Sequence, residues 1–160
     1  MLGLSCGYGI VRYGGSLGDV RSVAIDTPAN DSAEPGIEFV VADALRREFL
    51  RRHAVRLVED PGRADLVLSG RVLPIREHGS AFSSVVLSLE YRLTLELELR
   101  ATRPDGSKIA IDRRVQRETE TYLASADLEA QRKNRQEALR RVAGLLAQRV
   151  HDSLFEAATR

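Results

Sequence analysis

Residues 87–100, with the sequence LSLEYRLTLELELR, decide the fold of this chain. Apolar side chains occupy every odd position from Leu87 to Leu99, and polar or charged side chains occupy every even position. A period of two puts the two sets on opposite faces of a strand, whereas a helix would spread the leucines around its circumference. At about 3.3 Å per residue the strand would be roughly 45 Å long, so an equally long element must cover its apolar face.

A first covering helix is predicted over residues 35–53, where apolar residues recur at steps of three and four. The preceding segment, residues 27–34, is rich in turn formers and supplies capping oxygens and negative charge to the helix start. Four arginines occupy the side expected to face solvent, at Arg46, Arg47, Arg51 and Arg52. Asp43 and Glu48 precede two of them at the four-residue spacing of helical ion pairs.

A second helix is predicted to begin after a cap at Ser125 or Asp127 and to continue almost to Arg160. At about 1.5 Å per residue it would be roughly 45 Å long, which matches the leucine strand. Its apolar stripe consists of Leu128, Leu139, Val142, Leu146, Val150, Leu154 and Ala157, reinforced by Ala143 and Leu145.

Further strands are predicted at residues 20–26, 55–58, 64–75 and 108–122. The order strand, helix, strand makes the two strands at residues 20–26 and 55–58 parallel to each other. Gly70 and Pro74 suggest a bulge or an edge position in the third, and a polar loop is predicted at residues 77–84. The sequence therefore predicts an α+β fold, a two-layer sandwich with two helices on one face of a mixed four- to five-stranded sheet, in the order β-α-β-β-β-β-α.

Composition excludes several classes of function. The 160 residues carry 24 basic and 23 acidic side chains, so net charge points to no polyanionic partner, and no apolar run of 18 residues predicts a membrane-spanning helix. The three histidines and single cysteine do not have the spacing of a metal site, and no nucleophile motif occurs. We expect no enzyme, no metal and no cofactor.

Clustered arginines leave two interpretations open. Those of the two helices could contact phosphate groups, although surface helices commonly carry such charges mixed with Glu and Asp. A separate cluster lies on the outer face of the long strand and on its predicted partner, at Arg92, Arg100, Arg113, Arg114 and Arg117. Arginines on an extended strand are suited to lipid-linked phosphates or an acidic protein surface, and equally to plain solubility.

The segment Leu4-Ser5-Cys6-Gly7 resembles the end of a bacterial lipoprotein signal, in which the cysteine becomes the lipid-modified first residue. The glycines that follow, between Gly7 and Gly18, are typical of a tether. We therefore expect residues 1–19 to form a lipid-attachment site at Cys6 and a tether, and residues 20–160 to form a single domain.

Several short motifs, taken in order, resemble the LPS-assembly lipoprotein family LptE. They are Cys6-Gly7-Tyr8, Ala44-Leu45-Arg46-Arg47-Glu48, Glu59-Asp60-Pro61, residues 64–72 (ADLVLSGRV) and Glu90-Tyr91-Arg92-Leu93, followed by the long final helix. The resemblance implies an outer-membrane lipoprotein that faces the periplasm, plugs and helps to assemble the LptD β-barrel, and assists delivery of lipopolysaccharide to the outer leaflet.

Candidate site residues follow from this resemblance and from the polar lumen of membrane barrels. The residues expected at the barrel interface are Glu90, Arg92, Glu96 and Arg100, and those expected to contact lipopolysaccharide are Arg76, Arg92 and Arg114. Two alternatives remain open: a periplasmic lipoprotein of another pathway, such as a cell-wall synthase activator or a secretion-channel component, and a nucleic-acid-binding α+β module.

Overall fold

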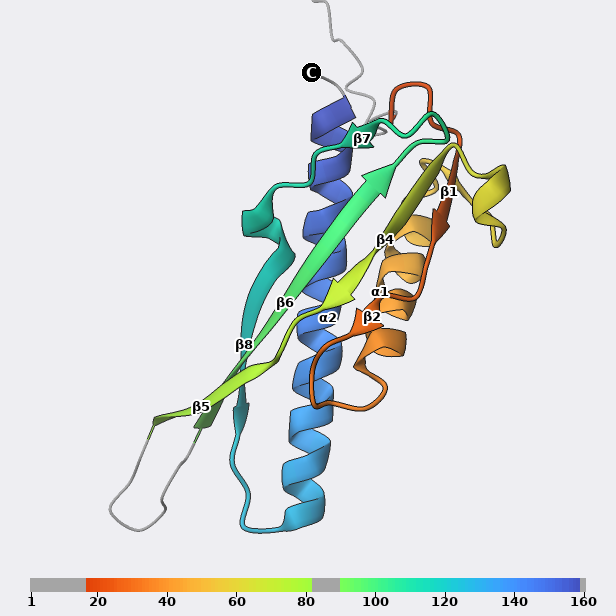
Figure 1. Ribbon diagram of the computed structural model, residues 1–160. Helices are drawn as coiled ribbons and strands as arrows, with labels where there is room; N and C mark the ends of the chain where they lie inside the picture. Colours follow the sequence, from red (N-terminus) through yellow and green to blue (C-terminus); the bar gives the residue numbers. More distant parts are fainter. Residues whose placement is uncertain (1–16, 82–89, 159–160) are drawn as a thin grey trace, which may run out of the picture.

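The computed structural model describes residues 17–81 and 90–158, and it confirms the predicted α+β class. In this part of the chain the strands are β1 (Ser22–Ile25), β2 (Ala29–Asn30), β3 (Arg56–Leu57), β4 (Leu66–Val72), β5 (Arg76–Ala81), β6 (Glu90–Thr102), β7 (Lys108–Ile109) and β8 (Arg117–Leu123). The helices are α1 (Ile37–Arg52) and α2 (Leu128–Ala158), with short 3-10 helices η1 (Pro61–Arg63) and η2 (Arg113–Gln116). Both α-helices lie on the same face of the sheet (Figure 1).

The eight described strands fill five positions across a mixed sheet. From one edge to the other these are β3, then β1 with β2, then β4 with β5, then β6, and finally β7 with β8. The pair β1–β3 is parallel, as predicted from the strand–helix–strand order. The pair β1–β4 is also parallel, and every pairing of β6 is antiparallel.

Strand β6 carries the predicted alternation of buried and exposed side chains. Leu93, Leu95, Leu97 and Leu99 are at most 7% exposed and face the helices. One even position departs from the pattern, since Thr94 is also buried and its hydroxyl lies 2.9 Å from that of Thr119 on β8. The first residues of the predicted strand, 87–89, lie outside the described residues. At about 1.5 Å per residue, the 31 residues of α2 give roughly 46 Å, enough to cover β6 along its length.

Both helices occupy the predicted spans, but their ends differ in detail. Helix α2 is capped by Asp127, whose carboxylate accepts hydrogen bonds from the backbone N–H groups of Glu129 and Ala130. Leu128 does not join the apolar stripe, because it lies in the first turn and is 74% exposed. The expected side-chain cap of α1 is absent, since its N-cap is Gly36 in a left-handed conformation.

Two predictions about strands are wrong. Residues 77–81, predicted as part of a loop, belong to strand β5, which continues β4 beyond Pro74 and pairs with the same side of β6. The predicted return strand is not continuous, because η2 separates β7 from β8. β5 forms because β6 is available to pair with it, and η2 lies where the Gln116 side chain, and not a strand, bonds to β6. Local composition reveals neither contact.

Gly70 marks neither a bulge nor an edge. It pairs with Leu99 in regular register in the middle of the sheet. A Cβ atom at this position would lie 2.9 Å from the Leu99 Cα atom and would collide with the Glu98 carbonyl oxygen. Glycine is therefore required by the close approach of β4 and β6.

Candidate functional site

The face of the sheet that α1 and α2 leave uncovered, which we call the open face, is the candidate site. Even-numbered residues of β6 point to it, because strand side chains alternate and the odd-numbered leucines point to the helices. Their cross-strand partners on the open face include Ser69 and Arg71 on β4, Arg76 and His78 on β5, and Arg117 and Thr121 on β8.

On the β4 and β5 side of β6, the charges of the open face are compensated. Arg76 pairs with Glu96 at 2.7 Å, and Arg100 pairs with Glu98 at 2.9 Å. Arg71 lies 3.2 Å from Asp31 and 3.7 Å from Glu98. These side chains are between 36% and 59% exposed, so each pair adds little to stability. Their effect is to neutralise this half of the face.

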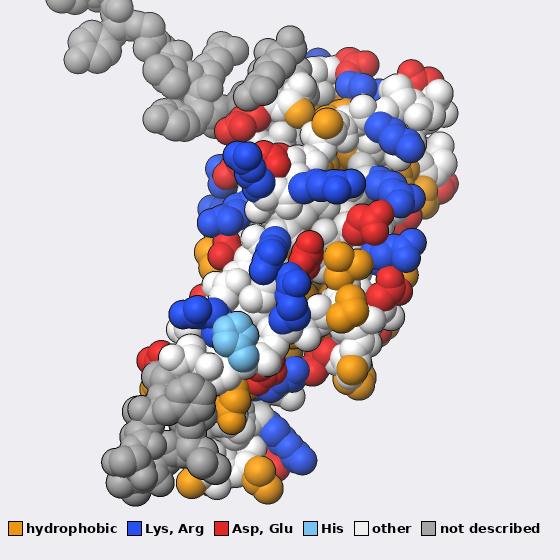
Figure 2. Space-filling view, turned by 60° about the vertical axis from the view of Figure 1, so that its left-hand side comes forward, with side chains coloured by type: hydrophobic (Ala, Val, Ile, Leu, Met, Phe, Trp, Pro, Cys, Tyr) orange, Lys and Arg blue, Asp and Glu red, His pale blue; other side chains and the backbone are white. Residues whose placement is uncertain are grey.

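On the β8 side, the arginines have no such partners within residues 17–81 and 90–158. Among the described residues, no ion pair or side-chain hydrogen bond engages Arg92, Arg113, Arg114 or Arg117. All four are exposed. Figure 2 shows Lys and Arg side chains gathered on this side of the molecule. This half of the open face therefore presents uncompensated positive charge, which is suited to carboxylate or phosphate groups.

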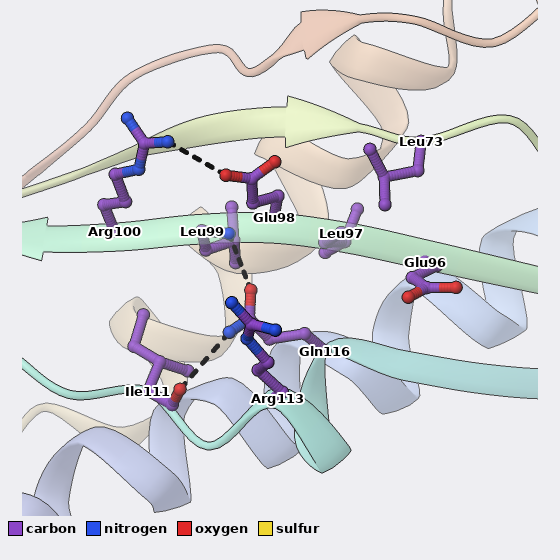
Figure 3. Close-up of a pocket in the computed structure, with 9 residues that line it drawn as sticks. All are labelled: Leu73, Glu96, Leu97, Glu98, Leu99, Arg100, Ile111, Arg113 and Gln116. Atoms are coloured by element: carbon purple, nitrogen blue, oxygen red, sulfur yellow. Dashed lines mark hydrogen bonds and ion pairs between the residues drawn. The ribbon is translucent and has the colours of Figure 1, made fainter.

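A cavity of about 470 Å³ lies where β6 loses its neighbour on the β8 side (Figure 3). The β8 pairing ends at Glu96 and the β7 pairing begins at Ala101. In between, the Gln116 side chain takes the place of a strand: its Oε1 atom accepts a hydrogen bond of 2.6 Å from the Leu99 N–H group. The lining residues are Leu73, Glu96, Leu97, Glu98, Leu99, Arg100, Ile111, Arg113 and Gln116.

The structure brings together most of the residues predicted for the site. Glu90, Arg92, Glu96 and Arg100 share the open face of β6, and Arg76 joins them through Glu96. Arg114 lies in η2 and not on a strand. Cys6 lies outside the described residues.

Two carboxylates of β8 lie on the face of the sheet that the helices cover, and not on the open face. Glu118 and Glu120 point towards α2, where they pair with Arg149 at 2.8 Å and with Arg141 at 2.9 Å. Sequence reasoning missed this because the return strand was predicted to be continuous, whereas η2 interrupts its alternation. Arg113 and Arg117 were part of the predicted arginine cluster, but nothing in the sequence distinguished them from arginines with partners.

Within residues 17–81 and 90–158, no group of three or more His, Cys, Asp or Glu side chains could hold a metal ion. None of the helices in this part of the chain is long and apolar enough to cross a membrane.

Solved structures with the same fold include three bacterial lipoproteins. Lipoprotein B from Nitrosomonas europaea is 12% identical, with a TM-score of 0.57, covering 89% of each chain. A minor lipoprotein from Acinetobacter baumannii is 18% identical, with a TM-score of 0.53, covering 85% of this chain and 91% of that one. Rare lipoprotein B from Shewanella oneidensis is 17% identical, with a TM-score of 0.50, covering 81% and 93%. At these identities the likeness concerns the fold alone.

No curated protein sequence matches the chain significantly. The family model LptE, described as lipopolysaccharide-assembly, matches residues 20–154, which include every described strand and most of α2. The chain therefore belongs to the LptE family of lipopolysaccharide-assembly proteins.

Proposed function

We propose that this protein is a non-enzymatic lipoprotein, anchored through Cys6 in the outer membrane and facing the periplasm. In this role it plugs an LptD-type β-barrel, helps to assemble that barrel and assists delivery of lipopolysaccharide to the outer leaflet. Membership of the LptE family supports the pathway. The uneven charge of the open face is the observation that supports our choice of contact surface.

The open face is the surface that we assign to the barrel. The lumen of a membrane β-barrel is polar, so a charged sheet face can be buried there with its charges paired. Glu90, Arg92, Glu96 and Arg100 lie on this face, whereas the leucines of β6 are already covered by the helices. The proposed contact is therefore polar, and it requires no catalysis.

For lipopolysaccharide we assign the half of the open face nearest β8. Phosphate groups are recognised best by guanidinium groups that have no competing carboxylate. Arg92 and Arg114 meet this condition among the described residues. Arg76 does not, because its guanidinium is 2.7 Å from Glu96, so it could contact a phosphate only after leaving that carboxylate.

The barrel contact is tested by reversing the free charges of the open face. We expect Arg92→Glu combined with Arg117→Glu to reduce co-purification of an LptD-type barrel while leaving the thermal unfolding midpoint unchanged, since neither side chain has an ion-pair partner among the described residues. The matched control combines Lys133→Glu and Arg140→Glu, an identical charge change on exposed positions of α2. Undiminished recovery, or an equal loss with the control, would contradict the assignment.

Anchoring is tested by labelling the full-length precursor with radioactive palmitate. We expect the label in the outer-membrane fraction and its loss in the Cys6→Ser variant. An unlabelled protein in the cytoplasmic fraction would contradict the proposed location and would favour a nucleic-acid-binding role, whose affinity should fall steeply with salt.

A further inference from the structure

The outer side of strand β3 has backbone N–H and C=O groups that pair with no described strand. β3 is the terminal strand, and no described strand pairs with its outer side. The N–H groups of Arg56 and Val58 donate to the carbonyls of Arg21 and Val23, at 2.9 and 3.0 Å. Because successive residues of a strand direct their backbone groups to opposite sides, the N–H and C=O groups of the intervening Leu57 point away from the sheet. Such an edge is a template for another strand.

A groove runs along this edge between α1 and β3. Two cavities of about 510 and 390 Å³ form it, and both are lined by Leu50 of α1 and Leu57 of β3. The Leu57 side chain faces the helix layer, since its partner Val23 is fully buried there. Leu50 is 55% exposed, because α1 lies at this end of the sheet and none of the described strands covers its outer flank (Figure 1). An added strand would cover it.

The rim of the groove is predominantly basic. Arg46 borders one cavity, and Arg21 and Arg56 border the other, whereas Glu59 is the one carboxylate among the lining residues. The Asp65 carboxylate near Arg56 already accepts hydrogen bonds from the backbone N–H groups of Arg21 and Ser22. Arg46 is held in place by a 2.8 Å hydrogen bond from its guanidinium to the Ile25 carbonyl oxygen. Charge complementarity therefore favours an occupant with acidic residues on either side of an apolar centre.

We propose that the β3 edge binds an extended, acidic-flanked segment of a partner protein as an additional strand of the sheet. Backbone groups of the segment would bond to Leu57, and alternate apolar side chains would cover Leu50 and Leu57. Glutamate or aspartate residues at its ends would meet Arg21, Arg46 and Arg56. Strands β1 and β4 separate this edge from β6, β8 and η2, which carry the uncompensated arginines of the open face, so the proposal does not depend on the proposed function.

The probe is a blocked synthetic peptide that alternates Val and Thr and has Glu at both ends, with a Lys-ended peptide as its counterpart. Binding is followed by fluorescence anisotropy and by hydrogen exchange of the Leu57 amide. We expect the Glu-ended peptide to bind and to protect that amide, and the Lys-ended peptide to bind at least about tenfold more weakly. No binding, equal binding of both peptides, or binding without protection of the amide would overturn the proposal.

Variants of the chain locate the contact. Leu50→Asp should weaken binding of the Glu-ended peptide at least about tenfold, because it places a charge against the apolar centre. Phe39→Asp is the matched control, because Phe39 is 64% exposed on the same helix and lies outside both cavities. The affinity of this variant for the Glu-ended peptide should equal that of the unsubstituted chain. Arg56→Glu, which leaves the groove floor intact, should also weaken binding. Equal losses in the control and the groove variants would overturn the assignment.

Discussion

His151 is a buried titratable residue at the interface of the two helices. Its ring stacks on Phe155 at 4.3 Å and meets Phe49 of α1 edge-on at 5.0 Å. Its Nε2 atom is buried and has no hydrogen-bond partner in the part of the chain that the structure describes, and Nδ1 lies 3.3 Å from an Asp152 carboxylate oxygen. Burial lowers the pKa of His151, and the nearby Arg52 guanidinium lowers it further, against the opposing effect of Asp152. The neutral imidazole is thus the form that fits the core.

This environment predicts loss of stability in mild acid. The folded-state pKa of His151 lies below the unfolded value of about 6.5, so the unfolded chain binds more protons between the two values. The contribution of His151 to the free energy of unfolding is therefore fully present above pH ~6.5 and decreases as the pH falls towards the folded-state pKa. We expect His151→Phe, which keeps an aromatic ring, to flatten this dependence in urea titrations measured at a series of pH values. An unchanged slope would show that other groups cause it.

Glu48 shows how a buried carboxylate is kept charged on α1. It is 5% exposed, and it accepts hydrogen bonds from Arg51 and Arg52 at 2.7 and 2.8 Å. Burial alone would raise the pKa of Glu48, but the two guanidinium groups outweigh it and hold the pKa below its ordinary value. The predicted pairing of Glu48 with Arg52 is confirmed, although Glu48 itself is not solvated as such helix-face charges usually are.

At the scale of elements, we predict that a glycine-to-alanine substitution has opposite effects on stability at Gly70 and at Gly144. Gly70→Ala should destabilise the chain by several kcal/mol, because its Cβ would collide with the β6 backbone and neither strand can move without breaking the ladder. Gly144→Ala should stabilise α2 by about 0.5–1 kcal/mol, because nothing lies within 4 Å of the added Cβ and alanine favours helix.

Both values are measured by urea unfolding of the two variants beside the unsubstituted chain. A small effect of Gly70→Ala would mean that β4 and β6 are not held as closely as the structure shows. A destabilising Gly144→Ala would point to a contact with that side of α2 that lies outside the described residues.

At the scale of the whole molecule, Arg135 joins segments that are far apart in the sequence. Its guanidinium on α2 donates to Glu34 before α1, at 2.6 Å, and to Glu77 of β5, at 2.9 Å. Glu77 also accepts a hydrogen bond from the Tyr122 hydroxyl on β8. Burial and this bond to Glu77 raise the pKa of Tyr122. One side chain thereby connects the helix layer to both sides of β6.

Removal of this connection should cost stability. Arg135 is 29% exposed, and Arg135→Met would leave two carboxylates close together without a shared cation, so we expect a loss of roughly 1–2 kcal/mol. Arg132→Met on the same helix is the control, because Arg132 pairs with Glu129 while 72% exposed and should contribute nothing measurable. Similar unfolding free energies for the two variants would contradict the proposed role of Arg135.

Sequence alone determined the parts of this protein that depend on neighbours along the chain. A period of two identified β6 and its buried face, steps of three and four identified the spans of α1 and α2, and the strand–helix–strand order identified a parallel pair. The same alternation put Glu90, Arg92, Glu96 and Arg100 on one face. The ordered motifs also pointed to the LptE family, which the match over residues 20–154 establishes.

Only the tertiary structure decided which groups meet across the sheet. β5 is a strand because β6 is available to pair with it, and η2 interrupts the return strand where the Gln116 side chain satisfies the Leu99 amide. Which arginines keep free guanidinium groups depends on whether a carboxylate from another segment comes within about 4 Å, and local periodicity carries no information about that distance. The uncompensated positive charge on the β8 side of the open face is therefore a property of the folded molecule, although the arginines themselves can be identified in the sequence.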